Sequence, residues 1–194
     1  MKTNKFRIAI FASGSGTNAE AIMKHFQNHR RIEVALLLSN NPEAGALLRA
    51  GDFDVPTKVF GKIQFHEGSE VIQWLKEAAV SHIALAGFLW LVPQNILHVF
   101  PGRIINIHPS LLPLFGGKGM YGSKVHDAVI AAGVKETGIT IHEVNDHFDE
   151  GRILFQTAFA VNENASAEEI AQKIHKLEHA HYPSVIEDWI LKTG

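Results

Sequence analysis

Two polar side chains lie one residue apart in the stretch NIHPSLLP, which follows an apolar run and spans residues 106–113. In an extended segment, residues i and i+2 point to the same face, so Asn106 and His108 are expected side by side. Pro109 then ends the strand, because proline cannot donate to the hydrogen-bond ladder. An amide beside an imidazole suits a reaction that builds negative charge on a carbonyl oxygen and protonates a leaving nitrogen.

A catalytic histidine usually has a carboxylate partner that orients its ring. The polar segment HEVNDHFDEG, residues 142–151, offers Asp146 and Asp149. A carboxylate close to His108 would favour the imidazolium form and raise the histidine pKa above about 6.5. Sequence spacing alone does not show which of the two aspartates is the partner of His108. In the alternative interpretation, the histidine only satisfies a backbone carbonyl and the acidic segment is a solvated turn.

A glycine-rich loop, SGSGTN at residues 13–18, joins the first apolar segment to the first helical one. Its glycines let the backbone approach a ligand closely, and the amides at the start of the following helix form an anion site. The residues expected to hold a phosphate are Gly14, Ser15, Gly16, Thr17 and Asn18. The loop lacks the third glycine of the dinucleotide fingerprint and the lysine of a P-loop. In the alternative interpretation, it is a tight turn before a helix capped by Thr17 and Glu20.

Two other chemistries fit the sequence less well. Serine hydrolysis requires a nucleophile elbow of the form Gly-x-Ser-x-Gly, and the loop at residues 13–18 does not have that spacing. His175 and His179 have the i, i+4 spacing of metal ligands, but no HExxH motif accompanies them. We therefore interpret the two histidines as part of a solvated helix face and predict that the protein uses no metal.

Composition limits the classes of protein that the chain can belong to. Its 194 residues are 46% apolar and 20% charged, with a formal net charge of -2, which fits one globular domain over residues 1–194. Scattered lysines and arginines give no basic patch for nucleic acid, and no apolar run reaches the ~18 residues of a membrane span. The absence of cysteine excludes disulfides, thiolate zinc sites and a cysteine nucleophile. The first residues do not resemble a signal peptide, so we expect a soluble cytoplasmic protein.

Short apolar runs alternate along the chain with segments of helical spacing. The expected strands are residues 6–12, 32–38, 57–60, 82–88, 103–107, 139–145 and 153–161, and the expected helices are residues 18–27, 43–50, 70–79, 93–100, 123–132 and a long closing helix that begins at the SAEE capping box of Ser166 and Glu169. Apolar strands separated by helices indicate a mostly parallel sheet that is covered on both faces. The predicted fold class is doubly wound, Rossmann-like α/β, in which ligands bind at the carboxyl ends of the strands.

Five motifs carry a family resemblance. They are ASGSGTN (residues 12–18), LAGFLWLVP (85–93), GRIINIHPSLLP (102–113), GITIHEVNDHFDEG (138–151) and LEHAHYP (177–183). Together they resemble the phosphoribosylglycinamide formyltransferase family, the folate-dependent enzymes of purine synthesis. The NIHPSLLP block is shared by the wider group of formyltransferases, and the GSGTN loop narrows the match.

The resemblance implies transfer of the formyl group of 10-formyltetrahydrofolate to the amine of glycinamide ribonucleotide, in de novo purine biosynthesis. By its motif, Asn106 stabilises the oxyanion, His108 is the proton donor, and Asp149 is the carboxylate that raises the pKa of His108. The substrate phosphate would bind at the loop of residues 14–18, and Glu178 would approach the glycinamide substrate, unless it is an ordinary surface carboxylate.

The resemblance also implies a folate pocket, lined by Leu89, Trp90, Leu91, Val92, Asn106, Val144 and Asp149. Two departures from the family pattern affect the binding sites. Trp90 stands where many relatives have a basic residue, and its ring is suited to stacking on the benzoyl ring of folate. The glycine-rich segment LFGGKGMYGSKVH, residues 114–126, carries Lys118, and we hypothesise that it closes over the ribonucleotide with this lysine near the phosphate.

Two other functions stay open at this point. A sugar-nucleotide N-formyltransferase would use the same three polar residues, Asn106, His108 and Asp149, and a non-catalytic folate or nucleotide-binding domain would have no need of all three. In every case the expected partners are small molecules, with no nucleic acid and no membrane, and the protein would be a monomer or a homodimer.

Overall fold

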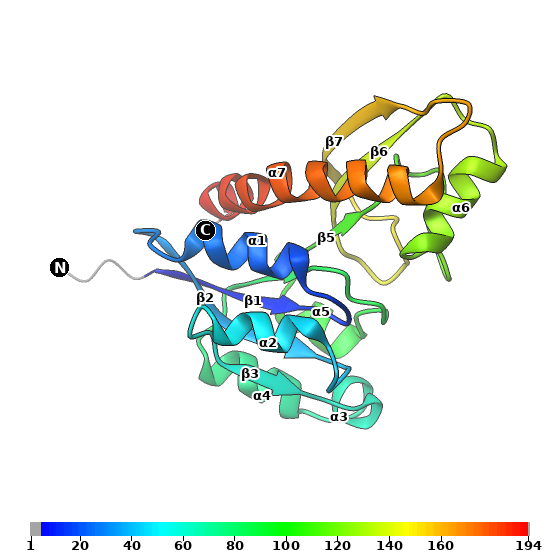
Figure 1. Cartoon of the computed structure of the whole chain (residues 1–194). Coiled ribbons are helices and arrows are strands. Elements are labelled where there is room, and N and C mark those ends of the chain that lie inside the picture. Colours follow the sequence, from blue (N-terminus) through cyan, green and yellow to red (C-terminus); the bar gives the residue numbers. More distant parts are fainter. Residues whose placement is uncertain (1–4, 194) are drawn as a thin grey trace.

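Seven strands in residues 5–193, the part of the chain that the computed structural model describes, form one sheet (Figure 1). The strands are β1 (Phe6–Phe11), β2 (Ile32–Ser39), β3 (Thr57–Val59), β4 (His82–Leu85), β5 (Ile104–His108), β6 (Glu136–Glu143) and β7 (Ile153–Ala160). Their order is β3-β2-β1-β4-β5-β6-β7; β1 to β5 pair in parallel, and β6 pairs antiparallel with both β5 and β7, so only β6 runs in the opposite direction. The prediction of a mostly parallel, doubly wound sheet is confirmed.

Helices cover both faces of this sheet (Figure 1). They are α1 (Thr17–Phe26), α2 (Gly45–Gly51), α3 (Lys62–His66), α4 (Glu70–Glu77), α5 (Gln94–Val99), α6 (Ser123–Ala131) and α7 (Ala167–Thr193). Buried side chains of α1, α2, α6 and α7 pack in one hydrophobic cluster, and those of α3, α4 and α5 pack in another. The sheet therefore lies between two helical layers, which explains why its central strands are apolar on both faces.

The alternation of side chains along β5 determines the face of the sheet on which Asn106 and His108 lie. Ile105 and Ile107 belong to the cluster formed with α1 and α7, whereas Ile104 belongs to the opposite cluster. Asn106 and His108 are one residue out of step with the first two, so they point to the same face as Ile104. The prediction that they lie side by side is confirmed.

Local hydrogen bonds and backbone conformation determine where α7 begins and where β4 ends. The capping box predicted at the start of α7 is present, because the Glu169 backbone N–H donates to Ser166 Oγ over 3.1 Å and the Ser166 N–H donates to Glu169 Oε2 over 2.8 Å. The fourth strand was predicted to reach residue 88, but β4 ends at Leu85 because the chain turns at Gly87, whose φ is +71°. The five-residue helix α3 was not predicted, since so short a segment has no clear periodicity.

The long helix α7 connects the sheet to the ligand-binding edge. Its buried residues include Ile174, Glu178, Tyr182 and Ile186, and the Tyr182 hydroxyl donates to the Leu85 carbonyl over 2.8 Å. This contact fixes the middle of α7 at the carboxyl end of β4. Across the described residues, α7 included, no helix has an apolar stretch long enough to cross a bilayer.

Candidate active site

A cavity of about 620 Å³ opens at the carboxyl ends of β1, β4 and β5. This is the edge at which doubly wound sheets bind ligands, and the volume suits a small organic substrate. All the site residues predicted from the sequence line it: Gly14, Ser15, Gly16, Thr17, Asn18, Leu89, Trp90, Leu91, Val92, Asn106, His108, Val144, Asp149 and Glu178. The fold thus brings together in one cavity segments that are far apart in the sequence.

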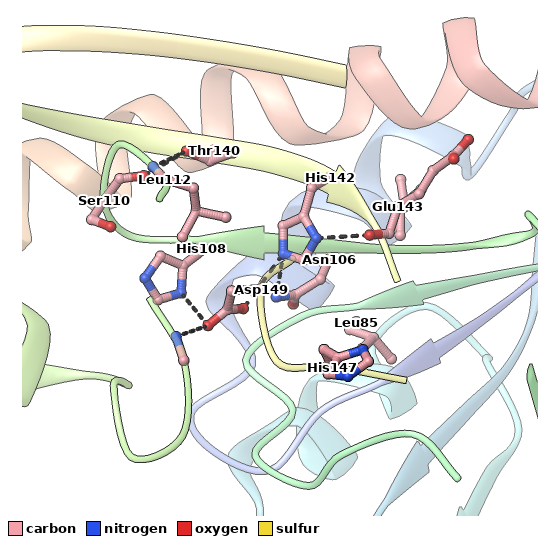
Figure 2. A network of polar contacts seen from close by, with 12 residues as sticks. Leu85, Asn106, His108, Ser110, Leu112, Thr140, His142, Glu143, His147 and Asp149 are labelled. Carbon is pink, nitrogen blue, oxygen red and sulfur yellow. Dashed lines mark hydrogen bonds and ion pairs between the residues drawn. The ribbon is translucent and has the colours of Figure 1, made fainter. Parts of the chain in front are cut away.

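Of the two candidate carboxylates, Asp149 lies beside His108 (Figure 2). Its Oδ2 is 3.6 Å from His108 Nδ1 and accepts a 2.9 Å hydrogen bond from the Gly117 backbone N–H. Asp146 instead pairs with His147 over 2.9 Å, and both of these side chains are more than half exposed. The structure therefore identifies Asp149, and not Asp146, as the carboxylate beside His108, a choice that sequence spacing alone did not allow.

His142 is a member of this cluster that the sequence analysis did not select. Its Nε2 lies 3.5 Å from Asp149 Oδ1 and 3.2 Å from Asn106 Nδ2, and its Nδ1 lies 2.8 Å from the Glu143 carbonyl oxygen (Figure 2). The residue stands directly opposite Asn106 in the β5–β6 ladder. The sequence held a signal that could have found His142: when β5 and β6 pair antiparallel, the segment that begins at residue 138 lies alongside the NIHP motif.

The contacts of His142 orient the Asn106 amide. A carbonyl can only accept, so His142 Nδ1 carries a proton that it donates to the Glu143 carbonyl. In the neutral ring, Nε2 is then the acceptor for one hydrogen of Asn106 Nδ2. The second hydrogen of the same amide nitrogen stays available to an oxygen atom in the cavity, which is the geometry that an oxyanion donor needs.

The pKa of His108 is lower than its ordinary value of 6.5, and the prediction of a raised pKa is wrong in its net direction. Burial is the largest cause, because the residue is only 3% exposed and a buried charge is poorly solvated. Asp149 does raise the pKa as predicted, helped by the Phe115 carbonyl, which accepts from His108 Nε2 over 2.8 Å. These two contributions do not offset burial together with the nearby His142.

The pKa of Asp149 is also lowered. Burial alone would raise it, but the proximity of the His142 and His108 imidazoles and the hydrogen bond from the Gly117 N–H outweigh that effect. The carboxylate is therefore ionised at neutral pH and faces both imidazoles.

The phosphate-loop candidate is held closely against α2. Gly16 precedes α1 with a φ of +79°, and a Cβ at this position would lie 2.4 Å from the Ala46 Cα. Arg49 Nε donates to the Ser15 carbonyl over 2.9 Å, and its guanidinium also pairs with Glu20. No side chain caps α1 and Glu20 is engaged with Arg49, so the capping-box interpretation of this loop is wrong.

Gly16→Ala is expected to lower the free energy of unfolding by about 1–3 kcal/mol, because the new Cβ combines a left-handed backbone with a clash against Ala46. Urea denaturation of the two proteins measures this difference. Gly14→Ala is the matched control, since a Cβ there meets nothing within 4 Å. Equal losses in the two variants would show that the close approach at Gly16 does not limit stability.

Glu178 is a buried carboxylate, so its interpretation as a surface residue is wrong. It is 6% exposed, and Asn18 Nδ2 donates to its Oε2 over 2.9 Å. Burial raises its pKa to about 7, although the hydrogen bond from Asn18 acts in the opposite direction. The pair connects α7 to the first turn of α1 at the wall of the cavity.

The other end of the cavity is apolar. Trp90 packs with Phe60, Phe65 and Phe88, and its ring is stacked on His66 with centroids 5.9 Å apart. Leu89 is 46% exposed at the opening. This wall suits a flat, largely apolar ligand group.

The fold and the cavity define a doubly wound α/β protein with a polar cluster between a glycine-rich loop and an apolar wall. Residues 6–186 match the family model described as formyl transferase. The chain is 40% identical over 188 residues to phosphoribosylglycinamide formyltransferase of Bacillus subtilis, covering 93% of each protein. It belongs to this formyltransferase family.

Other relatives agree with this assignment. The chain is 39% identical to the chloroplastic phosphoribosylglycinamide formyltransferase of Arabidopsis thaliana over 186 residues, which are 93% of this chain. It spans 64% of the length of that protein and 60% of its Vigna unguiculata counterpart. The crystal structure of phosphoribosylglycinamide formyltransferase from Bacillus halodurans superimposes with a TM-score of 0.86, 38% identity and 97% coverage of both chains.

Proposed function

We propose that this protein transfers the formyl group of 10-formyltetrahydrofolate to the amine of glycinamide ribonucleotide, a step of de novo purine biosynthesis. One observation carries the proposal: a single cavity holds Asn106, His108 and Asp149 between the glycine-rich loop and an apolar wall. The relatives named phosphoribosylglycinamide formyltransferase support the choice of substrates. The whole activity would then reside in one domain of residues 1–194.

The two ends of the cavity fit the two substrates. The amides of residues 14–18 and the start of α1 suit the phosphate of the ribonucleotide, and Glu178 then approaches the glycinamide substrate. Residues 89–92 and Val144 suit the folate ring system, with Trp90 available for contact with an aromatic group. The reacting groups would meet between these ends, beside Asn106 and His108.

The proposed reaction is direct attack. The amine nitrogen forms a bond to the formyl carbon, and the carbonyl electrons move to the oxygen, where the second hydrogen of Asn106 Nδ2 stabilises the charge. The oxyanion then re-forms the carbonyl as the bond from the formyl carbon to the folate nitrogen breaks, and His108 donates a proton to the departing nitrogen. The attacking nitrogen loses one proton, which restores the imidazolium.

Asp149 holds the His108 ring from the Nδ1 side, so Nε2 is the nitrogen available for proton transfer. In the structure, Nε2 donates to the Phe115 carbonyl, which belongs to the segment leading into the glycine-rich loop. Proton transfer from Nε2 therefore requires this hydrogen bond to open. Lys118, exposed at the cavity, lies on the same loop, in agreement with the idea that the loop moves over the ribonucleotide.

The direct test is the absorbance change as the purified protein removes the formyl group from 10-formyltetrahydrofolate. The assay is run with glycinamide ribonucleotide, with an amino sugar nucleotide and with no acceptor. We expect turnover only with glycinamide ribonucleotide. Turnover with the amino sugar nucleotide would favour a sugar-nucleotide N-formyltransferase, turnover without acceptor a hydrolase, and binding without turnover a non-catalytic domain.

A further inference from the structure

Ser13, the first residue of the glycine-rich loop, connects the two ends of the cavity without lining it. It is 6% exposed, and it does not belong to the cavity wall, whereas the next five residues of the loop do. Its polar atoms bond to the segments that follow β4 and β2. Ser13 therefore lies beneath the cavity, where three segments that follow strands of the sheet meet.

The apolar wall is tied to the rest of the chain through Ser13. The Ser13 backbone N–H donates to the Gly87 carbonyl over 3.1 Å, and the Leu89 N–H donates to Ser13 Oγ over 3.1 Å. Within residues 5–193, these are the only two hydrogen bonds that the backbone of residues 87–92 makes. The segment is neither helix nor strand, so the place of its backbone relative to the glycine-rich loop depends on Ser13.

The Ser13 hydroxyl has a fixed direction. Its O–H donates to Asn40 Oδ1 over 2.7 Å, which leaves an oxygen lone pair to accept from the Leu89 N–H. The Ser13 carbonyl accepts from Asn41 Nδ2 over 3.2 Å. The N–H, carbonyl and hydroxyl groups of this buried residue are thus all engaged, and a fully satisfied buried network of this kind is rigid.

This network lets a ligand at one end of the cavity affect the other end. A ligand held by the amides of residues 14–18 restricts the backbone on the carbonyl side of Ser13. The hydrogen bond to Leu89 passes that restriction to the wall, where Leu89 is 46% exposed and Trp90 is half-buried. A second ligand then meets a wall that is already ordered, so its binding loses less conformational entropy.

We infer that Ser13 is a positioning residue that couples the two substrate subsites, because its N–H and hydroxyl hold residues 87–92 against the glycine-rich loop. This inference rests on the proposed function for the identity of the two ligands. It assigns Ser13 to the mutual dependence of ribonucleotide and folate binding. The chemistry of the formyl group stays with Asn106, His108 and Asp149.

The test is isothermal titration calorimetry of tetrahydrofolate with and without saturating glycinamide ribonucleotide. Tetrahydrofolate has no formyl group, so no turnover disturbs the measurement. In the wild-type protein, we expect the ribonucleotide to lower the Kd of tetrahydrofolate by at least about fivefold, and tetrahydrofolate to lower the Kd of the ribonucleotide by the same factor. In Ser13→Ala, which lacks only Oγ, we expect a change of less than about twofold.

Ser81→Ala is the matched control. Ser81 Oγ donates to the Arg7 carbonyl over 3.2 Å and accepts from the Arg7 N–H over 3.1 Å. This variant also loses hydrogen bonds to the backbone, but none to residues 87–92, so it should keep the wild-type coupling. Ser13→Ala should fold, because Phe88 stays buried in the apolar cluster beneath the wall. A purely structural role of Ser13 would lower stability or weaken both ligands without changing the coupling.

Each outcome decides the inference. Equal coupling in wild type and Ser13→Ala, or an equal loss in Ser81→Ala, would overturn it. No gain in affinity in wild type, with normal formyl transfer, would also overturn it and leave the proposed function intact.

If glycinamide ribonucleotide neither binds nor reacts, the proposed function fails, and amide hydrogen exchange of the free protein still tests Ser13. We expect the Leu89 N–H to exchange at least about tenfold more slowly than an unprotected amide, and this protection to disappear in Ser13→Ala. Unprotected exchange of Leu89 in the wild-type protein would show that Ser13 does not hold the wall.

Discussion

His108→Ala is expected to lower kcat by about 10²–10⁴-fold while Kd for glycinamide ribonucleotide changes by less than about threefold. The variant removes the proposed proton donor, which is 3% exposed and held between Asp149 and the Phe115 carbonyl. It leaves the glycine-rich loop and Glu178 in place, so the contacts proposed for the ribonucleotide persist. Rapid-quench kinetics and calorimetry measure the two quantities separately.

A control is needed because the alanine leaves a small buried space. Thermal unfolding shows whether the variant keeps its fold, and His98→Ala, on the exposed side of α5, shows the effect of losing a histidine that does not line the cavity. A His108→Ala protein that turns over within a few fold of wild type would rule out His108 as the proton donor. A loss that appears entirely in Kd would instead assign His108 to substrate binding.

The sequence was sufficient to predict the position of Asn106 and His108, since a period of two along an apolar strand determines which side chains share a face. It was also sufficient to predict that the loop at residues 13–18 and the NIHP motif would meet, because both follow strands of a parallel sheet. These predictions rest on local periodicity and on a general property of the fold. Neither required knowledge of a particular contact.

The choice of Asp149 over Asp146 depended on contacts that no local pattern contains. Asp149 has a φ of +59°, and its carboxylate is anchored by the N–H of Gly117, which is 32 residues away in the chain. Spacing within a polar loop cannot predict a left-handed residue held by another loop, so the selection came only from the family resemblance.

The lowered pKa of His108 was unpredictable for a different reason. The sign depends on whether the charge of a neighbour outweighs the loss of solvation, and burial is a property of the whole packed structure. His142 also contributes, and its place beside Asp149 follows from the register of β5 and β6. A motif predicts which groups are near one another more readily than it predicts their protonation.

Asp149→Asn is expected to lower kcat/KM at pH 7.5 by about 100-fold or more, and to move the pH profile in a defined direction. The carboxylate is one of the two groups that raise the pKa of His108 against burial, so its removal lowers that pKa further. Activity that depends on the imidazolium is lost as pH rises through the His108 pKa. That limb of the profile should therefore move to lower pH in the variant. Asp146→Asn, which changes an exposed carboxylate paired with His147, is the matched control and should leave the limb in place. A limb that stays fixed in Asp149→Asn, or moves to higher pH, would show that Asp149 acts on catalysis without controlling the charge of His108.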